Sequence, residues 1–422
     1  MSELRETSPE TKSPLAAAGQ DEPAPDHRSR SLRWRRPSAL AVAVVLVALV
    51  AGVWVAQATR PRERVVEFAD QGAPASRPQA EARRDPRWEA LPRAPLSPRW
   101  GAFSAWTGSE FVVWGGYANV GTPQEATADD GAAFNPDTGR WRRLAAAPVE
   151  AMYGGVSLWT GRELWILGGI GEPHGRESKS AAAAYDASSN VWRVLPDLPA
   201  VITAGAWSAE TRQAVVATVD SQTRHVSAWM LDVDGDHWVA LPSLPSLKVD
   251  DGADPGLSIA AGDNRAFVVT GDKTLAVRLD QPDEWTAIAD RPPLDGAVAG
   301  ILTAWTGTGV LVTTAEAATL YDAATQTWRE VPPPPEMQGA QYALHATAGG
   351  HPVAVDEPTR SIAAFDPERA RWEALPDAPQ PVGNSAAVAA ATHQGELHVF
   401  VWGGSDQSNM PLGNGAVFRP AP

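Results

Sequence analysis

Short hydrophobic runs separated by turn-forming residues recur along most of this chain, and they predict many short β-strands. Within residues 101–143 four such runs follow one another: Ala102–Trp106, Phe111–Trp114, Ala132–Phe134 and Trp141–Leu144. Gly, Pro, Asn, Asp and Thr residues fill the breaks between them, as they do in tight turns. The pattern predicts a small four-stranded antiparallel sheet, and segments 159–169 and 181–192 repeat it.

Tryptophans mark the period of this repeat. They stand 43 to 53 residues apart, at Trp88, Trp141, Trp192, Trp238, Trp285, Trp328 and Trp372. Blades of β-propellers have periods of this length. Four of these tryptophans open a Trp-x-x-Leu-Pro sequence, in which Trp and Leu project from opposite faces of one strand. Both faces are therefore apolar, as a sheet packed between two neighbours requires, and the proline ends the strand.

Two further features accompany the tryptophans. Gly115-Gly116 closes an apolar strand, and Phe134 and Trp141 follow with six residues between them. The other copies, complete or partial, are Gly168-Gly169 with Tyr185 and Trp192, Tyr321 with Trp328, Phe365 with Trp372, and Gly403-Gly404. In these motifs the chain resembles bacterial kelch-repeat proteins, which are galactose-oxidase-like β-propellers. The resemblance implies a propeller and little about its chemistry.

The order of strands predicts how the ring closes. The repeats begin with a single outer strand at 87–91 and end with three strands after Trp372. If the first strand completes the last sheet, seven blades form and no sheet edge is left free to aggregate. We therefore predict an all-β fold, a seven-bladed kelch-type β-propeller over residues 87–420. It is expected to be monomeric, to be closed by pairing of 87–91 with the C-terminal blade, and to be preceded by one transmembrane helix.

The first 86 residues have a different composition. Residues 1–36 contain almost no large apolar side chain and are expected to be a disordered cytoplasmic segment. Residues 38–58 carry no charge and are long enough to cross the hydrocarbon core of a bilayer as a helix. Arginines are more numerous before this span than after it, which predicts that the propeller is exported. Residues 59–86 have the composition of a linker. The alternative to a retained membrane anchor is cleavage of a signal peptide after Ala58, which would make the protein secreted.

Charge and composition narrow the function. The net charge is −15, and residues 1–60 hold 8 basic and 6 acidic side chains, so the acidic excess lies in the propeller. This argues against a nucleic-acid partner. The chain has no cysteine, so it lacks the thioether crosslink that galactose-oxidase-like activity requires. Asp232–Asp236 resembles a calcium loop without its final glutamate, and His393 and His398 lack a third ligand, so we expect no metal and no cofactor.

Long connections between second and third strands predict the position of a site. They occur at 115–131, 168–180 and 403–415, while the other blades have short ones. With a closed ring these three blades are adjacent, so their loops form one sector of one face. Candidate binding residues there, or on the segments that approach the same face, are Arg99, Trp100, Tyr117, Asn119, Tyr153, Glu172, His174, Arg176, Asp406 and Asn409. The alternative is that these loops differ in length by drift and carry ordinary solvated residues.

Three functions remain open at this point. The leading hypothesis is a membrane-tethered extracytoplasmic propeller that binds a protein or a glycan through this sector. A sugar-active enzyme, such as the sialic-acid epimerases that kelch propellers also resemble, is the alternative. It would need an acid–base group near the channel mouth, where Arg99, Glu172 and His174 are nearest. A purely structural spacer without a ligand is the third, and the fold alone does not choose among them.

Overall fold

The computed structural model describes residues 88–419 with short gaps. The gaps are 123–124, 172–176, 221–222, 224, 245–246, 248–255, 295–300, 315, 336–341, 346–351, 357–360, 379–384 and 407. The predicted cytoplasmic segment, transmembrane helix and linker at 1–36, 38–58 and 59–86 therefore lie outside the described residues. The part of the chain that is described consists of strands and turns, and it contains no helix long and apolar enough to cross a membrane.

Seven four-stranded antiparallel sheets account for most of these strands, and we number the sheets 1 to 7 in chain order. Sheet 1 contains β3 (Phe103–Trp106), β4 (Phe111–Trp114), β7 (Gly131–Asn135) and β8 (Arg140–Arg143). Sheet 2 contains β9 (Val156–Trp159), β10 (Glu163–Gly171), β11 (Glu177–Asp186) and β12 (Val191–Val194). Sheet 3 contains β13 (Ile202–Ser208), β14 (Gln213–Val219), β15 (Val226–Asp232) and β16 (Val239–Ala240). Sheet 4 contains β17 (Ser258–Gly262), β18 (Arg265–Val269), β19 (Thr274–Arg278) and β20 (Thr286–Ala287).

The remaining sheets follow the same plan. Sheet 5 contains β21 (Leu302–Trp305), β22 (Gly309–Thr313), β23 (Ala318–Asp322) and β24 (Thr327–Val331). Sheet 6 contains β25 (Tyr342–His345), β26 (Val353–Asp356), β27 (Ile362–Asp366) and β28 (Arg371–Leu375). Sheet 7 contains β29 (Ala387–His393), β30 (Glu396–Trp402), β31 (Gly415–Phe418) and β1 (Trp88–Ala90). A three-stranded sheet joins β2 (Arg99–Trp100), β5 (Tyr117–Ala118) and β6 (Ala126–Thr127).

Sheet 7 is built from both ends of the described chain. β1 pairs antiparallel with β31, with Trp88 opposite Phe418 and Ala90 opposite Ala416. The predicted pairing of the strand at 87–91 with the last sheet is therefore present, and it covers the edge that β31 would otherwise expose.

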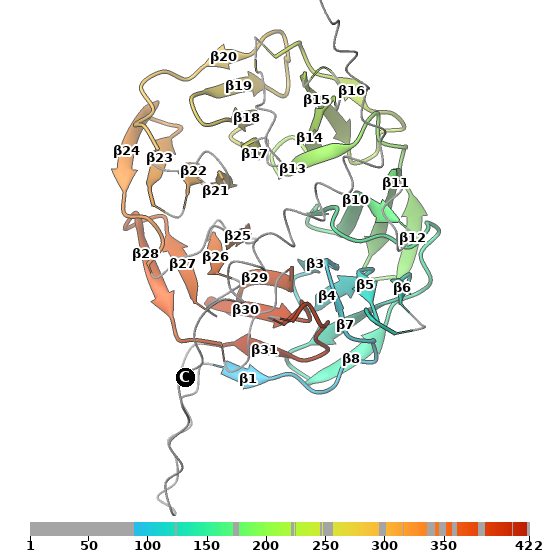
Figure 1. Cartoon of the computed structure of the whole chain (residues 1–422). Helices are drawn as coiled ribbons and strands as arrows, with labels where there is room; N and C mark the ends of the chain where they lie inside the picture. Colours follow the sequence, from blue (N-terminus) through green and yellow to red (C-terminus); the bar gives the residue numbers. More distant parts are fainter. Residues whose placement is uncertain are drawn as a thin grey trace, which may run out of the picture. The chain divides into compact units, whose positions relative to one another are not determined.

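Hydrophobic clusters lie between consecutive sheets. Sheets 1 and 2 share one cluster around Trp114 and Ile166, and a cluster of the same kind joins each following pair. The cluster between sheets 7 and 1 includes Phe111 and Phe400, whose rings stack with centroids 4.4 Å apart. Figure 1 shows these sheets side by side in chain order, with their first strands toward the middle. The fold is all-β and propeller-like, and its core consists of the surfaces between sheets.

Most of the repeated tryptophans join their own sheet to the one before it. In five of them the indole Nε1–H donates to the backbone carbonyl of the residue four positions after the preceding tryptophan. These bonds run from Trp88 to Pro376 (2.7 Å), Trp141 to Pro92 (2.9 Å), Trp192 to Ala145 (3.0 Å), Trp238 to Pro196 (3.1 Å) and Trp285 to Pro242 (2.8 Å). Proline ends the strand ladder, and its carbonyl is then free to accept from the neighbouring sheet. The Trp-x-x-Leu-Pro sequence is thus both donor and acceptor of a contact between sheets.

Two of the connections predicted to be long loops are more regular than expected. β10 continues past the diglycine to Gly171, where it pairs with Glu177 at the start of β11, and a register shift lies between Leu167 and Gly169. Residues 168–171 and 177–180 of the predicted loop belong to β10 and β11, and 172–176 lie outside the described residues. Ile170 also bridges to Tyr153, so the backbone here has partners on both sides, and this favours strand over loop. The connection 115–131 likewise contains β5 and β6.

The indole–carbonyl bonds lead to a matched test of stability. Trp285 and Trp372 are equally buried, at 7% and 8% exposed, but the Trp372 indole nitrogen has no hydrogen-bond partner among the described residues. Substitution of either by phenylalanine removes similar apolar area. We expect Trp285→Phe to lower the free energy of unfolding by about 1 kcal/mol more than Trp372→Phe, since only the former loses a hydrogen bond. Urea unfolding of the two variants measures this difference, and equal losses would contradict the role of the bond.

Candidate functional site

Two of the elaborated connections, those of sheets 7 and 1, pair with one short segment, Arg99–Gly101, which leads into sheet 1. The Arg99 amide donates to Leu412 and the Arg99 carbonyl accepts from Gly404, both in the connection of sheet 7. Trp100 is opposite Tyr117 in the β2–β5 pair, which belongs to the connection of sheet 1. Gly101 accepts from the Gly154 amide at 2.8 Å, at the approach to sheet 2. The connections of sheets 7 and 1 are thus hydrogen-bonded to this segment, and Ile170 in the connection of sheet 2 bridges to Tyr153, next to Gly154.

The diglycines position this segment and the equivalent one before sheet 2. Gly404 donates to the Arg99 carbonyl, and Gly116 donates to the Met152 carbonyl, both at 2.9 Å. A Cβ at Gly115 would lie 2.5 Å from the Met152 oxygen, and one at Gly403 would lie 2.7 Å from the Arg99 oxygen. Both glycines also have positive φ, 69° and 73°. Only glycine satisfies both conditions, so each of these diglycines is the place where one sheet receives the segment that leads into the next.

The Arg99 side chain is committed to internal contacts. It is 1% exposed. Its guanidinium donates to the Ser97 carbonyl and hydroxyl, to the Gly115 carbonyl and to the Asp130 carboxylate at 2.7 Å. Burial lowers the pKa of Arg99, and Asp130 partly opposes this effect. Because Gly115 and Asp130 are the two ends of the connection in sheet 1, Arg99 fixes the base of that connection and does not present its charge to a ligand.

Trp100, Tyr117 and Tyr153 form one aromatic cluster. Their ring centroids are 5.3 Å apart for Trp100 and Tyr117, 5.1 Å for Trp100 and Tyr153, and 5.3 Å for the two tyrosines. Tyr117 is 7% exposed, whereas Trp100 and Tyr153 are half-buried. Trp100 packs edge to face against each tyrosine, and the two tyrosine rings are tilted by 40° to one another. The cluster therefore offers the outer surfaces of Trp100 and Tyr153 and leaves no gap between the rings.

Tyr117 is held by the hairpin of β5 and β6. Its hydroxyl donates to Glu125, whose second carboxylate oxygen accepts from the Gly121 amide at 2.7 Å. Burial, with the hydrogen bond to Glu125, raises the pKa of Tyr117 to about 12, so the phenol stays protonated at neutral pH. Burial also raises the pKa of Tyr153. Asn119 lies at the turn of this hairpin with φ +56°, and its carbonyl accepts from Thr122.

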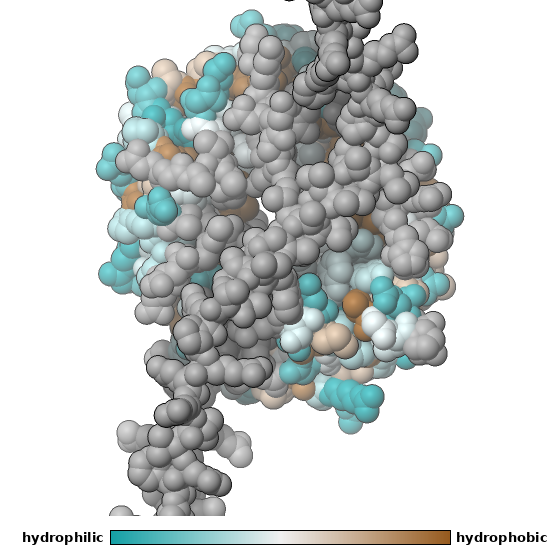
Figure 2. Space-filling view, viewed as in Figure 1, coloured by the Kyte–Doolittle hydropathy of each residue, from teal (hydrophilic) through white to brown (hydrophobic). Residues whose placement is uncertain are grey.

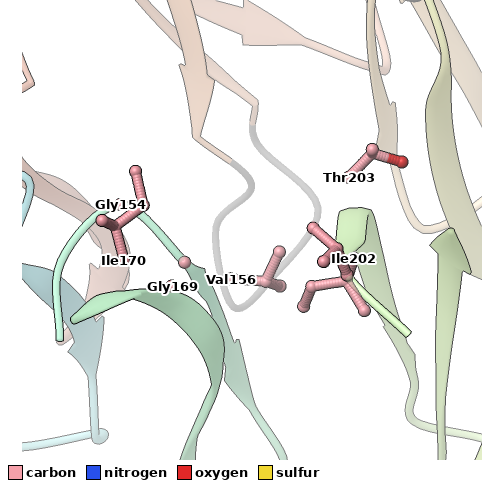
Figure 3. Close-up of a pocket in the computed structure, with 8 residues that line it drawn as sticks. Gly154, Val156, Gly169, Ile170, Ile202 and Thr203 are labelled. Atoms are coloured by element: carbon pink, nitrogen blue, oxygen red, sulfur yellow. The ribbon is translucent and has the colours of Figure 1, made fainter. Parts of the chain in front are cut away.

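A cavity adjoins the aromatic cluster on the side of sheet 3. Its volume is about 250 Å³, and it is lined by Gly154, Gly155, Val156, Gly169, Ile170, Val201, Ile202 and Thr203. Figure 3 shows Gly154, which precedes sheet 2, and Ile170 of β10 facing Ile202 and Thr203 of β13 across it. Tyr153 connects it to the cluster, since Tyr153 precedes Gly154 and bridges to Ile170. Sequence reasoning missed this cavity, although Gly154-Gly155 directly after a candidate tyrosine was a signal.

The remaining candidates divide into two groups. Asp406 caps a turn in the connection of sheet 7, where its carboxylate accepts from the Ser408 and Met410 amides at 2.8 and 2.9 Å. Asn409 is exposed in the same turn with φ +59°. Glu172, His174 and Arg176 lie outside the described residues. By sequence they follow Gly171 and hence the cavity residue Ile170.

The described surface seen in Figure 2 is mixed in character. Figure 2 shows described hydrophilic and hydrophobic residues interspersed on the side viewed in Figure 1. Within the described ranges, no group of three or more His, Asp or Glu side chains is arranged to hold a metal ion. Asp234 and Asp236, in the calcium-like sequence, are 88% and 92% exposed on a turn.

His393 and His398 lie together between sheets 7 and 1, away from the aromatic cluster. Their rings are 5.3 Å apart, and the His393 Nε2 is 3.1 Å from the Asp137 carboxylate of sheet 1. His398 is 7% exposed, and its Nδ1 has no hydrogen-bond partner among the described residues. Burial, followed by the charges of His393 and Arg419, lowers the pKa of His398, while Glu396 and Asp137 oppose this. The pair therefore belongs to a contact between sheets.

Neither a protein-family model nor a curated protein matches this chain. Among solved structures it is similar to a "Novel fungal alcohol oxidase with catalytic diversity among the AA5 family, in complex with copper", with a TM-score of 0.59 and 13% identity. The match covers 79% of this chain and 76% of the oxidase. At this identity the likeness shows the fold alone, which is galactose-oxidase-like and propeller-like.

The buried histidine predicts a pH dependence of stability. Because the folded-state pKa of His398 is lowered, its contribution is fully present above the unfolded value of about 6.5 and is lost as pH falls below that value. We expect the free energy of unfolding to decrease between pH 7 and pH 5, and His398→Gln to reduce that slope by up to about 1.4 kcal/mol per pH unit. The exposed His225→Gln serves as the control. Chemical unfolding at several pH values measures the slopes, and parallel slopes for His398→Gln and the native chain would contradict this prediction.

Proposed function

We propose that residues 87–420 form a closed, seven-bladed kelch-type propeller. Support comes from the seven four-stranded sheets, the pairing of β1 with β31, and the hydrophobic cluster that sheets 7 and 1 share. In such a ring the connections of sheets 7, 1 and 2 lie next to one another on one face, and this face would carry the site.

We propose that this face binds a glycan. The observation that carries the proposal is the aromatic cluster, with the half-buried Trp100 and Tyr153 supported from below by the buried Tyr117. Rigid aromatic surfaces bury apolar area at a low cost in conformational entropy, and they suit the C–H faces of sugar rings. The adjoining cavity is lined by glycine, valine and isoleucine with a single hydroxyl residue, Thr203, which suits apolar substituents of a sugar.

Binding without turnover fits the titratable groups of this site better than catalysis does. A general acid or base works best with a pKa near the operating pH. The pKa of Tyr117 is raised to about 12, and the guanidinium of Arg99 is buried and hydrogen-bonded to its own chain. Among the described candidates, neither of these groups is suited to proton transfer at neutral pH.

A sugar-active enzyme is the second candidate. It is favoured by one observation, namely that the cavity residue Ile170 is followed in sequence by Glu172 and His174, whose side chains have the chemistry of an acid–base pair. The solved structure with a similar fold is also an enzyme, an alcohol oxidase. Proton NMR of the protein with each bound sugar distinguishes the two functions, because a binder shifts the sugar signals and an enzyme creates new ones.

The glycan proposal predicts which residues binding requires. After a glycan array has identified a ligand, we expect Trp100→Ala and Tyr153→Ala each to weaken its binding at least tenfold, equivalent to about 1.4 kcal/mol. The half-buried Trp305→Ala, in sheet 5, should bind as the native protein does. Calorimetric titration of the three variants measures the affinities. Unchanged affinity in both site variants would contradict a site at this cluster.

We propose further that residues 38–58 tether the propeller to a membrane on its extracytoplasmic side. The support is the uncharged apolar composition of that span and the arginines before it. We expect the full chain to stay in the membrane fraction after alkaline washing, and added protease to digest the propeller from outside the cell. Deletion of 38–58 should leave the protein in the cytosol. A mature chain that begins after Ala58, found by mass spectrometry in the medium, would support cleavage instead.

A further inference from the structure

We infer that the glycan of this site carries an apolar group about as large as a benzene ring, and that the cavity between sheets 2 and 3 binds this group. The inference rests on the proposed glycan-binding function and adds the class of ligand, which is a glycoside with an aryl or short alkyl group. The construction of the two cavity walls supports it.

Both walls of the cavity are formed where a strand departs from regular pairing. In β10 the register shifts between Leu167 and Gly169, and in β13 it shifts between Ile202 and Ala204. Gly169 and Thr203, which line the cavity, stand at these two irregularities. Irregularities of this kind bend a strand, and they are frequent next to binding sites. Two of them on adjacent sheets open a space between sheets that otherwise share a hydrophobic cluster.

The residues that line this space are mainly apolar. Apart from three glycines and Thr203, the lining residues are Val156, Ile170, Val201 and Ile202. The Thr203 hydroxyl donates to the Ala217 carbonyl of its own sheet at 3.2 Å. A charged ligand group would lose its hydration here without a charged side chain to replace it. The cavity therefore favours hydrocarbon.

The size of the cavity selects its occupant. A Cβ at Gly205 would lie 2.9 Å from the Val156 Cγ1, so Val156 packs on the backbone of β13 and closes the cavity at that end. The volume is about 250 Å³. Apolar protein cavities of about 150 Å³ accommodate benzene. An acetyl or methyl substituent would leave most of this volume empty, whereas a phenyl group or an alkyl chain of similar size would fill more of it.

The cavity opens beside the aromatic cluster. Tyr153, whose ring packs against Trp100, precedes the lining residue Gly154 and hydrogen-bonds through its backbone to Ile170. A Cβ at Gly154 would meet no atom within 4 Å, so nothing obstructs the cavity at this residue. Val201 lines the cavity from the side of sheet 3 and is 50% exposed, which places an apolar side chain at the mouth. A glycoside can thus lay its sugar ring on Trp100 or Tyr153 and direct its apolar group past Gly154 into the cavity.

Paired glycosides test the inference on the full chain in lipid nanodiscs. The probes are the methyl and phenyl β-glycosides of glucose, galactose and N-acetylglucosamine. For the sugar that binds best, we expect the phenyl glycoside to bind at least tenfold more tightly than the methyl glycoside, because its apolar ring leaves water. Calorimetric titration measures the affinities, with empty nanodiscs as the blank. The hexyl glycoside of the same sugar then shows whether an aliphatic or an aromatic group is preferred.

Matched variants assign the preference to the cavity. Val201→Trp, which fills the mouth, should abolish the preference for the phenyl glycoside. Val239→Trp, at an exposed valine of sheet 3 outside the cavity, should keep it. Ile202→Ala removes part of one wall and should lower the preference without filling the mouth. Affinity for the methyl glycoside should not change in these variants, and circular dichroism checks that each of them is folded.

The possible failures are distinguishable. If methyl and phenyl glycosides bind equally and Trp100→Ala weakens both, the cavity does not hold the ligand and the glycan-binding proposal stands. If Val201→Trp and Ile202→Ala both keep the full preference, the apolar group binds elsewhere and the inference is wrong. If phenol alone binds as tightly as the phenyl glycoside and Trp100→Ala has no effect, the glycan-binding function fails and the inference with it. If none of the glycosides binds, the inference fails, and the glycan array decides the glycan-binding proposal.

Discussion

The indole–carbonyl hydrogen bond between neighbouring outer strands is the contact on which the arrangement of this molecule depends. The same bond recurs from Trp88 to Pro376 and from Trp141 to Pro92, so the N-terminal strand takes part both as donor and as acceptor. Through it sheet 7 is linked to sheet 6 and to sheet 1. The position of sheet 1 in turn determines where the segment Arg99–Gly101 lies, and that segment is hydrogen-bonded to the connections of sheets 7 and 1.

Diglycine turns explain why the site lies in this sector. Each turn leaves the space that a Cβ would fill to a carbonyl oxygen, at Met152 for Gly115 and at Arg99 for Gly403. The residue that follows each carbonyl is aromatic, Tyr153 in one case and Trp100 in the other. The same diglycine turn, present in sheets 1 and 7, therefore brings the centroids of the two rings to 5.1 Å from each other. Stability and candidate function share these glycines, and a side chain at either position would disturb both.

The charged side chains near the site also differ in role, because some stabilise the fold and others are exposed to solvent. The Arg99 guanidinium hydrogen-bonds to Ser97, Gly115 and Asp130, so its charge is neutralised within the fold. Asp129, in the same connection, is exposed. In the sequence alone, Arg99 next to Trp100 predicts a cation beside an aromatic ring in a binding site. Burial reverses the expectation, because a guanidinium that satisfies five internal contacts is a structural group.

The sequence by itself determined the repeat, the strands of sheet 1 to within one residue, and the partner of the first strand, because strand periodicity and turn residues act over short distances. It also selected Trp100, Tyr117 and Tyr153. Tertiary structure alone decided that these rings touch, that β10 and β11 extend past the diglycine, and that a cavity separates Gly154 from Ile202. Such features depend on how two sheets, distant in the chain, approach each other. The side chains of both sheets set the distance between them, so the sequence of a single strand does not predict it.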